Sequence, residues 1–335
     1  MKLLFELSKE HNTIPRCEVI STLKAEDFIY DIISSNEDVL IINTTTPSEK
    51  IKNLAKRLSY TFFIDELLFS CPPSLDIIEK CAKENPIDRI GSIAISFKNR
   101  STSINSQSIL KILGEIYTKD KQVDLNNPDL EIRVFITDTK VYVGLKIAEV
   151  IRREFEKRKV QHRPFFSPIS LHPKLARALV NLSSINKDKT LLDPFCGTGG
   201  ILLEAGLIGA RIIGSDIEKK MIDGCQKTLD YYGIKNYKLI HSDIGEIHNH
   251  ISKVDAVVSD LPYGKSTTTK GENIKDLYNR AFEKILQVLK KNAIAVIGSP
   301  DIDIYKIGKK YFSILEKHEL RVHKSLTRYF AVFQE

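Results

Sequence analysis

The chain has 335 residues, of which 42% are hydrophobic and 28% are charged. This length and this balance are typical of a folded protein of two or three domains, and they exclude a disordered or fibrous chain. The formal net charge of +7 is uneven, because residues 1–150 carry 19 Lys and Arg against 22 Asp and Glu, while residues 151–335 carry 31 against 21. A basic second half fits a polyanionic partner and, equally well, an unevenly charged soluble surface.

The sequence also argues against a membrane-spanning, secreted or metal-dependent protein. No apolar run is long enough to cross a bilayer, and the N-terminal MKLLFELSKEHN turns charged too early for a signal peptide. The cysteines are scattered without the CxxC spacing of zinc sites, which predicts reduced thiols in a cytoplasmic protein without a metal. They are Cys17, Cys71, Cys81, Cys196 and Cys225.

The first 150 residues predict two small α+β domains. In residues 1–65, strands are expected in MKLLFEL and VLIINT, and amphipathic helices in PRCEVISTLKAE and PSEKIKNLAKRLS. In residues 66–150, RIGSIAISFKN reads as a strand and SILKILGEIYT as a helix. EIRVFITDTKVYVGLKIAEV then predicts a hairpin that turns near TDTK.

Residues 151–170 form a predicted basic linker, in which arginine and lysine crowd together ahead of Pro164. A solvated helix and a hinge that contacts phosphates fit this run equally well, because guanidinium groups suit bidentate phosphate contacts. The spacing alone does not separate these two interpretations.

Residues 171–335 predict an α/β domain with a Rossmann-like, doubly wound sheet. Short apolar runs in TLLD, RIIGSD, YKLIHSD, DAVVSD and AIAVIG alternate with helical spacing, and LTRYFAVFQE is a final strand that suits antiparallel pairing with YFSILEKHEL. Four successive strands end in aspartate, at Asp193, Asp216, Asp243 and Asp260. One such aspartate is usually a helix cap, but four indicate a ligand-lined edge, since ligands bind beyond the carboxyl ends of such strands.

The turn DPFCGTGG follows the first of these strands and opens a helix. Its glycines let the backbone bend and approach a ligand closely. The dinucleotide pattern GxGxxG fails at Leu202, and no Lys-Ser/Thr pair follows for a Walker loop. An aspartate ahead of the glycines suits a cationic ligand, Asp216 suits ribose hydroxyls, and Asp243 suits an adenine amine. S-adenosylmethionine matches each of these parts.

The stretch VVSDLPYGKS predicts the reacting end of the pocket. Asp260 and the carbonyl of Leu261 are expected to accept hydrogen bonds from an exocyclic base amine and to orient its lone pair toward a methyl donor. Pro262 fixes the turn, and the ring of Tyr263 is expected to stack on the base.

Three segments, DPFCGTGGILLEAG, GSDIEKKMIDG and DLPYGKS, resemble the class I, amino-directed methyltransferases. More narrowly, with RPFFSPISLHPKLARALVNL and HKSLTRYF on either side, the chain resembles the archaeal tRNA guanosine-10 N2-methyltransferases. The resemblance implies an N-terminal ferredoxin-like domain, a THUMP domain that holds the tRNA 3′ end, a linker, and a Rossmann-like catalytic domain. That family makes N2-methylguanosine and then N2,N2-dimethylguanosine.

Carried over to this sequence, the resemblance implies that Asp193, Gly197 and Gly199 line the methionine end of the cofactor. The full predicted cofactor set is Asp193, Cys196, Gly197, Thr198, Gly199, Asp216, Ile217, Asp243 and Ile244. The predicted RNA contacts are Arg152, Arg153, Lys157, Arg158, Arg163 and Arg328. The chain departs from the family at Leu261, where the family usually has proline.

Other functions remain open from the sequence. The sheet motifs also permit methylation of ribosomal RNA guanine, DNA adenine N6 or a protein amide, and an RNA-binding protein with a vestigial cofactor fold. A small-molecule methyltransferase fits less well, because the first 150 residues suggest a large substrate. We expect an enzyme that acts on tRNA as a monomer.

Overall fold

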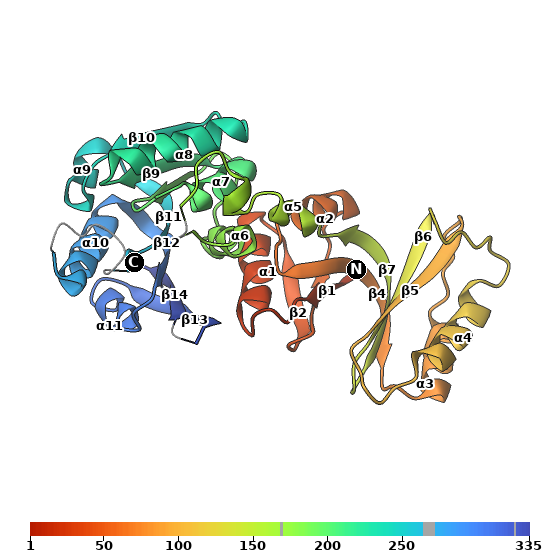
Figure 1. Ribbon diagram of the computed structural model, residues 1–335. Coiled ribbons are helices and arrows are strands. Elements are labelled where there is room, and N and C mark those ends of the chain that lie inside the picture. The colour runs from red at the N-terminus through yellow and green to blue at the C-terminus, as the bar shows by residue number, and fades with distance from the viewer. Residues whose placement is uncertain (168–169, 264–271, 325) are drawn as a thin grey trace. The chain divides into compact units, whose positions relative to one another are not determined.

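The computed structural model describes residues 1–167, 170–263, 272–324 and 326–335 (Figure 1). The chain divides into two compact units. The first holds residues 1–8, 28–56 and 61–150, and the second holds residues 9–27, 57–60 and 151–335. Among the described residues, no helix has both the length and the apolar character that a membrane span requires.

The first unit is built on one seven-stranded sheet. Its strands are β1 (Lys2–Leu7), β2 (Tyr30–Ser35), β3 (Val39–Thr44), β4 (Thr61–Cys71), β5 (Ile93–Asn99), β6 (Leu130–Ile136) and β7 (Val141–Glu149), and its helices are α2 (Ser48–Ala55), α3 (Leu75–Glu84) and α4 (Ser106–Tyr117). The strand order is β2-β3-β1-β4-β7-β6-β5, and only β5 and β6 pair in parallel. The predicted hairpin is confirmed, because β6 and β7 pair antiparallel with Ile136 opposite Val141.

The expected boundary at residue 65 falls inside β4. This strand pairs with β1 on one side and with β7 on the other, so both parts of the region share one sheet. The sequence TFFIDELLFSC has no glycine, proline or asparagine that would separate the two parts, and its strand was not predicted. The strand β2 and the helix α3 were also missed.

The second unit contains another seven-stranded sheet, in the order β10-β9-β8-β11-β12-β14-β13. Its strands are β8 (Thr190–Asp193), β9 (Arg211–Asp216), β10 (Tyr237–His241), β11 (Val254–Asp260), β12 (Leu289–Ser299), β13 (Ser313–His323) and β14 (Leu326–Gln334). The first five are parallel, and β14 pairs antiparallel with β12 and β13. This confirms the expected doubly wound sheet and its final antiparallel pair. The strand order reverses between β8 and β11, where such sheets bind ligands.

Helices cover both faces of this sheet. Among the described residues, the α-helices of this unit are α1 (Ile14–Ala25), α5 (Arg153–Glu156), α6 (Pro173–Leu182), α7 (Gly200–Leu207), α8 (Lys219–Tyr231), α9 (Ile247–His250), α10 (Ile274–Val288) and α11 (Ile304–Gly308). In β11, Ala256 and Val258 belong to a core that includes α6 and α7, whereas Val257 belongs to a core that includes α10. The strand is therefore buried on both faces, which explains its unbroken apolar run.

The helix α1, expected within the first domain, belongs instead to the second unit and packs against α6. The reason is polar as well as apolar. The fully buried Glu18 carboxylate accepts hydrogen bonds from the Ser59 backbone and hydroxyl, from the Tyr60 amide and from the Asn181 side chain. Four donors satisfy this buried charge, so three separate segments of the chain are fixed together.

Candidate functional site

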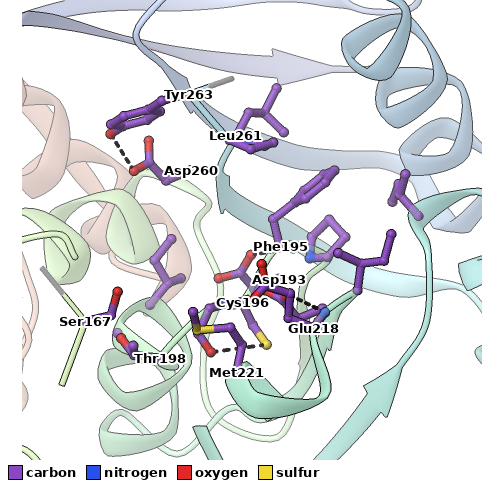
Figure 2. Close-up of a pocket in the computed structure, with 18 of the residues that line it drawn as sticks. Ser167, Asp193, Phe195, Cys196, Thr198, Glu218, Met221, Asp260, Leu261 and Tyr263 are labelled. Carbon is purple, nitrogen blue, oxygen red and sulfur yellow. Dashed lines mark hydrogen bonds between the residues drawn. The ribbon is translucent and has the colours of Figure 1, made fainter. Parts of the chain in front are cut away.

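A pocket of about 220 Å³ lies at the carboxyl ends of β8, β9 and β11 (Figure 2). It gathers most of the predicted cofactor and catalytic residues at one edge of the sheet. From the predicted set its lining includes Asp193, Cys196, Gly197, Thr198, Asp216, Ile217, Asp243, Ile244, Asp260, Leu261, Pro262 and Tyr263. The predicted Gly199 is not part of that lining.

Asp193 is the most deeply buried acid of the pocket, with 1% of its surface exposed. Its Oδ1 accepts hydrogen bonds from the Ser259 hydroxyl at 2.6 Å and from the Phe195 amide at 3.2 Å. Burial raises the pKa of Asp193 to about 7, and the charges of Asp216 and Asp260 act in the same direction. A cation at this point would therefore be stabilised by the ionised carboxylate and would favour that form.

The glycines of DPFCGTGG have different tasks. Gly197 has φ +48°, lines the pocket, and has no heavy atom within 4 Å of the position where a Cβ would lie. Gly199 has φ +79°, and a Cβ there would lie 2.5 Å from the Cys225 sulfur of α8. Gly199 therefore lets α7 begin close to α8, and its expected contact with a cofactor stays a prediction.

Asp216 fixes the glycine turn. Its Oδ2 accepts a hydrogen bond from the Gly197 amide at 2.9 Å, and its Oδ1 accepts one from the Glu218 amide at 2.9 Å. Burial raises the pKa of this carboxyl. Each oxygen of a carboxylate has a further lone pair, so Asp216 can also accept hydrogen bonds from ribose hydroxyls.

Asp243 lies two residues beyond the end of β10 rather than at it, which corrects the expected strand boundary. It caps a short 3₁₀ helix, where its Oδ1 accepts a hydrogen bond from the Gly245 amide at 2.7 Å. The Arg280 guanidinium of α10 also pairs with Asp243 and reaches Glu272 at 2.5 Å. The carboxylate expected to meet an adenine amine thus has an arginine partner in this structure.

Asp260 ends β11 and lies beside the Tyr263 hydroxyl (Figure 2) and the Arg328 guanidinium. The Tyr263 hydroxyl donates a hydrogen bond to its Oδ2 at 2.9 Å. Arg328 Nη1 lies 3.8 Å from the same oxygen, and the Arg328 guanidinium carbon lies 5.2 Å from the centre of the Tyr263 ring. Burial raises the pKa of Asp260, against the lowering effects of Arg328 and of the tyrosine hydrogen bond.

The loop after Asp260 is held by hydrogen bonds. The Leu261 amide donates to the Gly298 carbonyl at 2.8 Å, and the Pro262 carbonyl accepts from the Tyr278 hydroxyl at 2.8 Å. The Leu261 side chain is buried, with 1% of its surface exposed. Residues 264–266 of the quoted DLPYGKS stretch lie outside the described residues, as do residues 168, 169 and 325 of the flanking segments.

Three arginines that were predicted to contact RNA have internal partners, which is a correction. Arg158 binds the fully buried Glu204 carboxylate through Nε and Nη2, at 2.8 and 3.1 Å. Arg163 is 6% exposed, and its Nε donates to the Arg158 carbonyl at 2.9 Å. Arg328 is 8% exposed and lies beside Asp260. Guanidinium groups buried in this way are not available to phosphates.

The remaining predicted RNA contacts lie nearer the surface. Arg152 pairs with Glu10, whereas Lys157 pairs with Glu154 at 2.7 Å and keeps 67% of its side chain exposed. Arg153, in the short helix α5, is exposed. These positions remain compatible with either a solvated helix or a phosphate contact.

Some pocket residues were not predicted. Phe195 and Met221 lie inside the quoted motifs DPFCGTGG and GSDIEKKMIDG, so their position in these motifs could have predicted that they line the pocket. Arg280 and Glu272 belong to no motif, and the sequence offers no signal that Arg280 reaches both Asp243 and Glu272. Ser170, whose hydroxyl lies 3.1 Å from that of Thr198, comes from the segment before α6.

The chain is similar in sequence to known protein families and to named relatives. Residues 160–329 match the model of a family described as RMKL-like, methyltransferase domain, and residues 76–227 match a DNA methylase model. A tRNA (guanine(10)-N2)-dimethyltransferase of Methanothermobacter thermautotrophicus is 33% identical, over 100% of this chain and 99% of the relative. The protein of the same name in Methanocaldococcus jannaschii is 32% identical over 99% of each chain. That of Pyrococcus abyssi is 37% identical over 68% of this chain and 69% of its own.

Solved structures share the fold at low sequence identity. TrmN from Thermus thermophilus superposes with a TM-score of 0.58 at 18% identity and covers 100% of both chains. SMU.472 complexed with SAH gives a TM-score of 0.54 at 16% identity, over 99% of this chain and 97% of its own. The described chain therefore shares its fold with these two proteins.

Proposed function

The chain belongs to the family of tRNA (guanine(10)-N2)-dimethyltransferases, and on that premise we propose that it methylates the exocyclic N2 amine of guanosine 10 in tRNA with S-adenosylmethionine as methyl donor. The products are N2-methylguanosine and, after a second transfer, N2,N2-dimethylguanosine. The observation that carries the proposal is the pocket that gathers Asp193, Asp216 and Asp260 at one sheet edge.

The pocket fits S-adenosylmethionine by the chemistry of its donors. Asp193 is a buried carboxyl whose raised pKa makes a cationic partner favourable, which suits the methionine end. The open space beside Gly197 allows close approach to the backbone, and Asp216 has lone pairs left for a ribose. When bound, the cofactor supplies an electrophilic methyl group on a positively charged sulfur.

Asp260 and Leu261 can activate an exocyclic base amine, which is a weak nucleophile on its own. The lone pair of such an amine is delocalised into the ring, which makes the nitrogen a poor nucleophile. A carboxylate and a backbone carbonyl that accept its two N–H groups hold the amine in place and favour the pyramidal nitrogen of the transition state. The ionised Asp260, or water beside it, then accepts the proton that the methylated amine releases.

Tyr263 has to change partner for the stacking role that the sequence suggested. Its hydroxyl donates to Asp260 Oδ2, the atom that the amine would approach. The proposal therefore includes a shift of this hydrogen bond when the base enters the pocket. The ring remains beside Asp260, where it can cover one face of the base.

For the first unit we propose the ferredoxin-like and THUMP assignments, with the tRNA 3′ end as the ligand. Its continuous sheet and three helices support an α+β module of suitable size, whereas its slight excess of acids disfavours extensive phosphate contacts. Arg153 and Lys157 are the proposed phosphate contacts of the linker. All five cysteines are free, which supports a reduced, cytoplasmic protein, and we propose that it acts as a monomer.

Nucleoside mass analysis tests this function. Unmodified tRNA transcripts are incubated with the protein and S-adenosylmethionine, digested and compared with transcripts in which position 10 is adenosine. The proposal predicts N2-methylguanosine first and N2,N2-dimethylguanosine later, in the guanosine-10 transcript alone. Methylated adenine, or equal methylation of both transcripts, would contradict it.

A further inference from the structure

We propose that Arg328 is a positioning residue that favours the ionised form of Asp260 and sets the orientation of the Tyr263 side chain for methyl transfer. This role deepens the proposed function and rests on it. It differs from the phosphate contact that the sequence suggested for Arg328. The argument uses the register of three strands, the burial of both side chains, and the charges around Asp260.

The sheet register brings Arg328 to Asp260 across an intervening strand. Asp260 of β11 lies opposite Gly298 of β12, and Gly298 lies opposite Phe330 of β14. Arg328 precedes Phe330 by two residues, so both side chains leave the same face of β14. Because β12 carries a glycine at this point, no side chain separates the guanidinium from the carboxylate.

Gly298 is required for this approach. A Cβ at this position would lie 2.8 Å from Asp260 Oδ1 and 2.7 Å from a carbon of the Phe330 ring. Both contacts are shorter than real Cβ contacts, so any larger residue would displace Asp260 or Phe330. The antiparallel strand β14 and the glycine of β12 together make the space in which the pair forms.

Burial makes the pair energetically important for Asp260. The exposed fractions of the Arg328 and Asp260 side chains are 9% and 16%. Burial favours the neutral carboxylic acid, and Arg328 is the foremost of the groups that oppose this effect, ahead of the Tyr263 hydroxyl. Asp260 in turn contributes to the raised pKa of Asp193 of β8 and to that of Tyr278 of α10. Arg328 is thus the cation that favours the ionised, hydrogen-bond-accepting form of Asp260.

The contact with Tyr263 adds a geometric effect. The guanidinium carbon lies 5.2 Å from the centre of the tyrosine ring, which is within the range of a cation–π interaction. The tyrosine hydroxyl donates a hydrogen bond to Asp260 Oδ2, and Arg328 lies closest to the same oxygen. Oδ1 is buried beside Gly298 without a hydrogen-bond partner. Arg328 therefore holds the ring and the carboxylate in one arrangement.

The surroundings of Arg328 disfavour a phosphate contact. Its Nε is buried and has no hydrogen-bond partner, and the whole residue is 8% exposed. Arg321, seven positions earlier on the neighbouring strand β13, is exposed. This exposed arginine of the same hairpin is the matched control for loss of one positive charge.

The experiment compares Arg328→Met, Arg328→Lys and Arg321→Gln with the unmodified protein. Single-turnover methyl transfer is followed from pH 5.5 to 9, together with the KM for tRNA and the affinity for S-adenosylmethionine. We expect Arg328→Met to lower the rate about tenfold or more at neutral pH, with KM and cofactor affinity changed less than about twofold. The acid limb of the pH–rate profile of Arg328→Met should move to higher pH. Arg328→Lys should restore most of the rate, and Arg321→Gln should leave the rate and the pH profile unchanged.

A second measurement does not depend on tRNA methylation. The carboxyl ¹³C signal of Asp260, assigned by comparison with Asp260→Asn, is titrated in the free protein. We expect a higher pKa in Arg328→Met than in the unmodified protein. If the pKa rises in this way but the unmodified protein does not methylate tRNA, the proposed function is overturned while the charge effect of Arg328 remains. An unchanged titration, or a raised KM for tRNA with an unchanged rate and pH profile, would overturn the positioning role.

Discussion

The Tyr278 hydroxyl donates a hydrogen bond to the Pro262 carbonyl at 2.8 Å. Tyr278 is fully buried in α10, and the Ser299 hydroxyl in turn donates to the Tyr278 oxygen at 3.2 Å. The loop that follows Asp260 is therefore fixed by a helix and by the end of β12. This support explains how the loop keeps its path with leucine, rather than a second proline, at position 261.

Removing this hydroxyl with Tyr278→Phe should loosen the loop without changing the pocket walls. The Pro262 carbonyl would lose its partner, which we expect to reduce the free energy of unfolding by about 1 kcal/mol and the rate of methyl transfer about fivefold. Cofactor affinity, measured by calorimetry, should stay the same. Tyr311→Phe, a hydroxyl outside the pocket lining, is the control, and equal effects of both changes would contradict the role of Tyr278.

The raised pKa of Asp193 predicts that cofactor binding weakens in acid. The folded, ligand-free protein holds a proton on Asp193 up to about pH 7, and a cationic ligand needs the ionised form. Below that pH, binding must first remove the proton, so the affinity for S-adenosylmethionine should fall by up to about tenfold per pH unit. Calorimetry from pH 5.5 to 8.5 measures this change.

Two controls separate Asp193 from other groups that titrate. Asp193→Asn should bind the cofactor weakly with little dependence on pH. 5′-Methylthioadenosine, which lacks the charged methionine end, should bind the unmodified protein with an affinity that changes little between pH 5.5 and 8.5. If the affinities for both ligands fall equally in acid, the group that titrates is not Asp193.

The two glycines of the DPFCGTGG turn that have positive φ, Gly197 and Gly199, should respond differently to alanine. Gly197→Ala meets no neighbour and should reduce the free energy of unfolding by about 1–2 kcal/mol through backbone strain alone. Gly199→Ala should lower it by about 1–3 kcal/mol more, because its Cβ would meet the Cys225 sulfur at 2.5 Å. Denaturant unfolding of the ligand-free protein measures both. The double variant Gly199→Ala with Cys225→Ala should recover the steric part, and equal losses for both glycines would contradict the packing role of Gly199.

The basic linker should divide by burial into stabilising and RNA-binding positions. Arg158→Ala should lower the free energy of unfolding by about 2 kcal/mol or more, because Glu204 stays buried with Arg177 as its remaining partner. The double change Arg153→Gln with Lys157→Gln should leave the stability unchanged. It should reduce the slope of log affinity for tRNA against log salt by up to about 2. An unchanged slope would make the exposed part of the linker a solvated helix.

The local patterns of the sequence predict the second unit well. Continuous apolar runs between helical segments indicate a doubly wound sheet, and the aspartates at the ends of its strands mark the edge where the pocket lies. Parallel strands buried on both faces leave this clear signal because each must be apolar throughout. The strand β4 was missed because its mixture of apolar and acidic residues follows neither period cleanly.

The sequence could not predict which acidic side chains pair with Arg158 and Arg328. Arg158 and Glu204 are 46 residues apart, and Arg328 meets Asp260 only because of the strand order in the sheet. A run of basic residues has the same appearance whether its side chains face solvent or a buried acid. The attachment of α1 to the second unit likewise depends on Glu18 and Asn181, which lie 163 positions apart.

Methyl transfer by Asp260→Ala is the most direct test of the proposed reaction centre. Asp260 lines the pocket at the end of β11, apart from Asp193 and Asp216 on the other strands. We expect the variant to bind S-adenosylmethionine with nearly the same affinity and to transfer no detectable methyl group to unmodified tRNA in a single-turnover assay. Substantial transfer to guanosine 10 by this variant would contradict the assignment of Asp260 as the residue that holds the target amine.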